Sequence, residues 1–132
     1  MNNLINKKNV LTLFGVITLI EGVGFYLGAE AITKGAFSAD LLTEEGLIVG
    51  TLMHQALASA MLVIAVIVLF ARNLEGASGA KVLMGVGVGN LIFLAGALIH
   101  QFTAPVTPPL PAMILMAVFA LLAFYTANKK ED

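Results

Sequence analysis

The chain contains no cysteine, and charged residues make up only 11% of its 132 positions. Without cysteine it has no disulfides, no thiol redox chemistry and no thiolate metal sites. A soluble domain of this size normally carries about 25% charged residues. Because 59% of the residues are hydrophobic and the mean hydropathy is +0.96, we expect lipid to surround most of the chain. The absence of a basic stripe argues against nucleic acid as a partner.

Four apolar stretches are each long enough to cross a bilayer, which takes about 20 residues. They cover residues 10–29, 47–71, 82–102 and 110–127. The sequence therefore predicts an all-α protein, with residues 1–132 forming a single transmembrane domain and an integral membrane four-helix bundle. A cleaved signal peptide is the rival interpretation of the first stretch, and Glu21 inside that stretch argues against it.

Capping residues predict where several of these helices begin and end. Thr43 is a suitable N-cap for the second helix. Pro105 should end the third helix at the residue before it. Thr107 should then cap a fourth helix that Pro108 opens. A short interfacial helix is expected after Ser38, where apolar side chains are mixed with acidic ones.

The basic residues predict the orientation in the membrane. In a four-span arrangement, six basic residues fall on one side of the membrane: Lys7, Lys8, Arg72, Lys81, Lys129 and Lys130. Lys34 is the only basic residue on the other side. Both termini are therefore predicted to be cytoplasmic. The expected location is the inner (plasma) membrane of a bacterium.

Polar side chains within the spans are the best functional candidates, because a charge there costs about 2.5–3.5 kcal/mol even on the lenient scale. Counted from the outer ends at about 1.5 Å per residue, Glu21 and His54 lie at similar depths, roughly 12 Å and 10 Å. By the same count Asn90 is deeper and His100 is near the interface. The predicted ligand-binding or proton-handling residues are Glu21, His54, His100, Asn90, Gln55 and Gln101.

Several interpretations of this group remain open. Glu21 and His54 could satisfy each other as a structural pair. Alternatively, the group could form a pocket for a quinone-like or lipid-like ligand, or exchange protons near neutral pH. A metal held by Glu21, His54, His100 and Met113 is a further possibility. Haem between the two histidines is disfavoured, since their depths differ by roughly 7 Å. The sequence specifies no cofactor.

Catalysis is not predicted, and no catalytic residue is assigned. The chain has no phosphate-binding glycine loop, no HExxH motif and no recognisable Ser-His-Asp arrangement. Small residues instead predict helix-packing faces. These are Gly24 and Gly28 in the first span, Gly50, Ala58 and Ala65 in the second, and Gly85, Gly89 and Gly96 in the third. The predicted partners are the lipid bilayer and a second copy or another membrane protein.

The layout of four spans and a short acidic outer loop in 132 residues resembles the DoxX-like group of small bacterial membrane proteins. This resemblance is architectural and implies no role for any residue. Glu21 in the first helix is also similar to the membrane-embedded Glu of small multidrug-resistance transporters. The absence of tryptophan, the longer outer loop and the strong charge bias depart from that family and argue against antiport.

The sequence thus predicts a small multi-pass membrane protein, a subunit or partner-binding module with a polar pocket in its outer half. The alternative is a transporter or redox-associated protein that binds a proton, a metal or a quinone-like or lipid-like ligand at that pocket.

Overall fold

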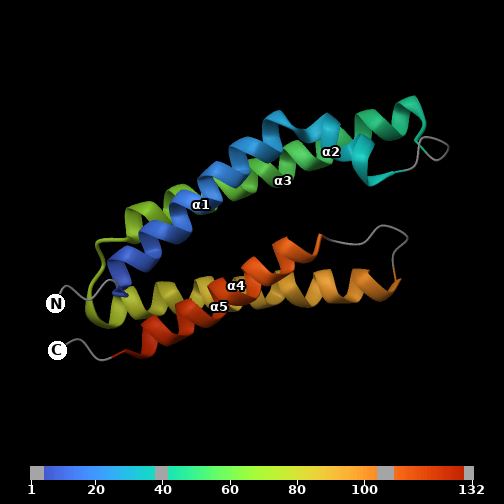
Figure 1. The fold of residues 1–132 in the computed structure, drawn as a ribbon. Helices are drawn as coiled ribbons and strands as arrows, with labels where there is room; N and C mark the ends of the chain where they lie inside the picture. Colours follow the sequence, from blue (N-terminus) through green and yellow to red (C-terminus); the bar gives the residue numbers. More distant parts are fainter. Residues whose placement is uncertain (1–4, 38–41, 104–108, 130–132) are drawn as a thin grey trace. The chain divides into compact units, whose positions relative to one another are not determined.

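The computed structural model describes residues 5–37, 42–103 and 109–129, and all the regular structure in these ranges is helical. The helices are α1 (Lys7–Leu27), α2 (Ala29–Ala36), α3 (Glu44–Ala71), α4 (Gly76–Thr103) and α5 (Leu110–Asn128) (Figure 1). Four of them, α1, α3, α4 and α5, are long and apolar enough to cross a membrane. The predicted all-α fold with four long apolar helices is confirmed.

The described residues divide into two compact units. One unit is Gly15–Leu69, and the other combines the described residues on either side of this segment. The boundaries fall inside α1 and α3. A single transmembrane domain over residues 1–132 stays a prediction.

Local side-chain hydrogen bonds fix the beginnings of α1 and α3. The backbone N–H of Gly46 donates to Thr43 Oγ1 at 3.0 Å, so the predicted N-cap of α3 is confirmed. At the start of α1, the N–H of Asn9 donates to Asn6 Oδ1 at 2.8 Å in the same manner. These bonds satisfy donors that the first turn of a helix leaves without a backbone partner.

The predicted fourth span, residues 110–127, agrees with α5, but the expectation that Pro108 opens this helix is wrong. The helix α5 begins at Leu110 with Pro109 at its N-cap, so Pro108 does not open it. Pro109 has an extended backbone conformation (φ −65°, ψ 128°), so the helix begins two residues later than the expected start at Pro108. The proposed cap Thr107 lies outside the described residues. The described end of α4 at Thr103 agrees with an ending just before Pro105.

A short helix, α2, follows α1 directly and was not predicted. The hydrogen-bond pattern of α1 continues across the junction, since Gly28 N–H donates to Gly24 O at 2.8 Å and Ile32 N–H to Gly28 O at 2.9 Å. The helical path therefore extends about two turns past the expected end of the first span. The interfacial helix expected after Ser38 falls partly on residues 38–41, which are outside the described ranges.

In the unit Gly15–Leu69, α1 and α3 run antiparallel and approach closely at glycines (Figure 1). A Cβ atom at Gly15 would lie 3.3 Å from the carbonyl oxygen of Ala65, and one at Gly22 would lie 3.3 Å from that of Ala58. The two contacts are one heptad apart on both helices. Ala58 and Ala65 are fully buried, which confirms the predicted small-residue face of α3.

In the other unit, α4 packs against α5. Gly87 accommodates the ring of Phe124, whose Cε1 atom would be 2.8 Å from a Cβ at this position. The first residues of α1 join this unit through Phe14, whose ring meets Phe119 edge-on with centroids 5.3 Å apart. The absence of a side chain at Gly87 allows the close contact with Phe124.

The glycines that make these contacts differ from the predicted ones. A Cβ at Gly24, Gly85, Gly89 or Gly96 would meet no atom of the described residues within 4 Å. Spacing alone could not distinguish them from the glycines that pack, because a GxxxG pair shows only that two glycines share a helix face.

Replacement of Gly22 by alanine should lower stability by about 1–3 kcal/mol, because the new methyl would lie 2.8 Å from Leu62 Cδ2. Gly24→Ala is the matched control. It gives the same gain in helix propensity, but its new methyl group lies in open space, so the variant should be neutral or stabilising. Thermal unfolding of the purified protein in detergent measures both. Equal melting temperatures for the two variants would contradict the α1–α3 contact.

Candidate functional site

His54 on α3 is held by two hydrogen-bonding neighbours. Its Nδ1 atom lies 2.8 Å from the carbonyl oxygen of Gly50 and 3.1 Å from Thr33 Oγ1. The Thr33 hydroxyl donates its own proton to Ala29 O at 2.9 Å. A carbonyl oxygen can only accept, so Nδ1 carries the hydrogen and Thr33 Oγ1 accepts from it as well. In the neutral ring Nε2 then has a lone pair and is the atom left to bind a ligand or proton.

The contact of α2 with α3 that creates this arrangement depends on Gly50. A Cβ atom there would lie only 2.5 Å from Thr33 Cγ2. The Thr33 side chain is completely buried, as is nearly all of Ala29 one turn earlier. Thr33 was not among the predicted site residues, because it lies in the polar segment that follows the first predicted span. The four-residue spacing of two small side chains, Ala29 and Thr33, is the signal that could have indicated a packed helix.

Glu21 does not share a level with His54, contrary to the sequence prediction. Glu21 is adjacent to Gly22, which contacts α3 at Ala58 and Leu62. His54 lies about six residues nearer the start of α3, or about 9 Å along the helix axis. The predicted depths were counted from residues 29 and 47, as if these two residues lay at the same level. The helical path continues through α2, so α3 packs against it in a shifted register and the two residues lie at different levels.

Glu21 is partly buried and has no hydrogen bond or ion pair with any of the described residues. His54 is satisfied by Thr33 and Gly50 instead. The structural Glu21–His54 pair considered above is therefore absent from the described contacts. Gln55, next to His54, is also partly buried, and its backbone oxygen accepts from Ser59.

The remaining candidates belong to the unit that contains α4 and α5. Asn90 is partly buried and donates from Nδ2 to Val86 O at 2.9 Å, so its own helix satisfies it. His100 and Gln101 are exposed near the end of α4. Met113 on α5 is buried. In the part of the chain that the structure describes, no three His, Asp or Glu residues are grouped to hold a metal ion. A site that combines all six polar residues stays a prediction.

A charged pair marks the exposed side of α2. Lys34 Nζ donates to Glu30 Oε1 one turn away. This hydrogen bond and the positive charge of Lys34 lower the pKa of Glu30 below its ordinary value. Both side chains are exposed, so the pair is a solvated feature of the helix surface.

Comparison of the chain with protein-family models, curated proteins and solved structures found no significant match. The resemblance to the DoxX-like group therefore stays a prediction.

The neutral imidazole of His54 should be the tautomer with hydrogen on Nδ1, because the Gly50 carbonyl can only accept. Nitrogen-15 NMR of protein labelled at histidine measures this directly, and the variant His100→Gln identifies the signals of the only other ring. A protonated Nε2 beside a bare Nδ1 in the neutral ring would contradict the described hydrogen bond.

Proposed function

We propose that the protein is an integral membrane protein that works by association, as a non-enzymatic subunit or partner-binding module. Its docking surface is the glycine face of α4, defined by Gly85, Gly89 and Gly96. The observation that carries this proposal is that α4 contacts α5 on one side, and that nothing in its own unit fills the glycine positions on the opposite side.

Membrane insertion is supported by the large apolar surface of the long helices. Their most apolar windows have mean hydropathies between 1.9 and 2.2. No more than 33% of any such window is buried within the structure. The apolar remainder has to be covered by lipid or by other helices, because water solvates such a surface poorly.

Helix geometry places the glycine face away from α5. At about 100° per residue, Gly85 and Gly89 lie roughly 160° from Gly87, which contacts Phe124 on α5. Gly96 lies within about 20° of each of the other two. A row of glycines lets another backbone approach closely, and close packing is what holds helices together in lipid. A second copy of the chain or another membrane protein would fit this face.

The orientation with both termini in the cytoplasm is supported by the position of the basic residues. Lys129 Nζ donates to Ile5 O at 3.1 Å, so the end of α5 lies beside the start of α1. Lys7, Lys8 and Arg72 line one cavity in the same unit. This gathers cations at one end of the apolar helices, and the positive-inside rule assigns that end to the cytoplasm. A bacterial plasma membrane is the proposed location.

A second candidate function is favoured by His54. Its Nδ1 is fixed by Gly50 and Thr33, the type of arrangement that orients ligating histidines. A transporter or redox-associated protein could use Nε2 to bind a proton or a quinone-like or lipid-like ligand. Binding there would change the nitrogen signals of His54 and leave those of His100 unchanged.

Replacement of Gly89 by leucine should weaken self-association about fivefold or more, since a bulky side chain in a close-packed contact costs about 1–3 kcal/mol. Val88→Leu enlarges an exposed neighbour on a different side of α4 and is the matched control. Native mass spectrometry of the full-length protein in detergent reports the oligomeric state. A monomeric starting protein would exclude a second copy as the partner.

The proposed orientation makes single-cysteine variants informative, because the chain has no cysteine of its own. In intact cells, a membrane-impermeant maleimide should label Gly35→Cys, an exposed position on α2 where a Cβ meets nothing within 4 Å. It should label Ser78→Cys, exposed at the start of α4, only after permeabilisation. The reverse pattern would invert the topology, and labelling of both variants in intact cells would contradict four spans.

A further inference from the structure

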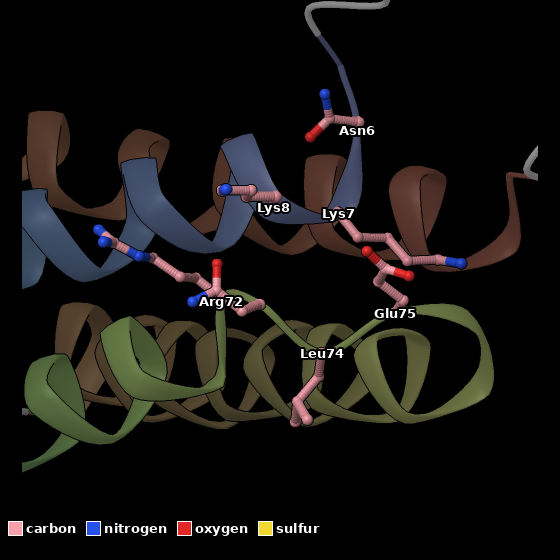
Figure 2. Close-up of a pocket in the computed structure, with 7 residues that line it drawn as sticks. Asn6, Lys7, Lys8, Arg72, Leu74 and Glu75 are labelled. Atoms are coloured by element: carbon pink, nitrogen blue, oxygen red, sulfur yellow. The ribbon is translucent and has the colours of Figure 1, made fainter.

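A basic cavity of about 400 Å³ lies between the start of α1 and the turn that joins α3 to α4 (Figure 2). All of its lining residues belong to the same unit of the structure. They are Asn6, Lys7, Lys8, Arg72, Asn73, Leu74 and Glu75.

The charge of this basic cavity favours an anion. Three cationic side chains, those of Lys7, Lys8 and Arg72, line it together with the single carboxylate of Glu75. The guanidinium of Arg72 can donate two parallel hydrogen bonds to a phosphate, and an ammonium group adds a compact charge. Because α1 begins at Lys7, the positive end of its dipole lies at the same place. Lys8 and Arg72 are exposed and therefore accessible to a ligand.

Close packing holds the two walls of the basic cavity together. Lys7 is only 9% exposed, and its Cδ atom would lie 3.4 Å from a Cβ at Gly79. The same Cβ would lie 2.3 Å from the carbonyl oxygen of Leu74, so the turn folds tightly onto α4. The sequence identified these cations as topology determinants only, because it could not show that residues 65 positions apart share a cavity.

We propose that the basic cavity binds the phosphate group of an anionic membrane lipid. This inference rests on the proposed membrane insertion, which places the ends of the apolar helices at the level of the lipid headgroups. A phosphate would then arrive attached to a lipid, and basic pockets between helices at the cytoplasmic surface suit such headgroups. Free inorganic phosphate has the same chemistry, so the experiment has to distinguish it from the lipid headgroup.

The test is lipid binding to the full-length protein in detergent, titrated with phosphatidylglycerol or phosphatidylcholine and followed by native mass spectrometry. Phosphatidylglycerol should bind more tightly than phosphatidylcholine. Arg72→Gln and Lys8→Gln should each weaken phosphatidylglycerol binding about fivefold, the effect expected for one cation near an anionic headgroup. Lys81→Gln is the matched control: it removes the same charge from an exposed position that does not line the basic cavity.

Three results would overturn the inference. If Arg72→Gln and Lys81→Gln lost equal amounts of affinity for phosphatidylglycerol, the lipid would be attracted by the overall charge of the protein and not bound at a site. Equal affinity for both lipids would show that headgroup charge plays no part. If low millimolar inorganic phosphate displaced the lipid, the cavity would still be a phosphate-binding site, but free phosphate and not a lipid would be its ligand. Unchanged melting temperatures of the variants exclude unfolding as the cause, and the cysteine labelling above tests membrane insertion independently.

Discussion

The close approach of α1 to α3 at Gly15 and Gly22 is the contact on which the unit Gly15–Leu69 depends. It brings the helix α1 against the backbone carbonyls of Ala65 and Ala58. Because the contacts repeat every seven residues on both helices, they determine one antiparallel register. That register continues to α2, where Thr33 meets Gly50 and His54. The environment of the histidine is therefore a consequence of glycine contacts several turns away.

The chain satisfies many of its polar side chains within its own helices. Thr12, Thr33, Ser59, Asn90 and Thr103 each donate to the carbonyl oxygen four residues earlier. Such bonds suit a low-dielectric environment, since an unsatisfied polar group is costly there. His54 differs because its partners come from two helices and fix one ring nitrogen, which leaves the other for chemistry. Glu21 differs because it has no hydrogen bond or ion pair with the described residues.

The basic residues matter in two ways, through their overall distribution and through the cavity that some of them line. Their overall excess at one end of the apolar helices is a diffuse signal for topology, to which each cation contributes wherever it lies. Lys7, Lys8 and Arg72 also share a cavity with Glu75, and this depends on the fold. In the proposed orientation, the same charges would both orient the protein in the membrane and bind the phosphate of one headgroup.

The sequence by itself determined the elements: four long apolar helices, the cap at Thr43 and the small-residue face through Ala58 and Ala65. These follow from local composition and spacing, because hydrophobic length and capping act within a few residues of the chain. It did not reveal α2, whose eight residues carry only two buried side chains. Only the tertiary structure decided which glycines make contact and which polar groups meet. Gly22 and Gly24 lie on the same helix but about 160° apart, and only the first faces α3. The register between the helices places Thr33, and not Glu21, beside His54. The sequence could not show this register, because it arises from shape complementarity between segments that are distant in the chain.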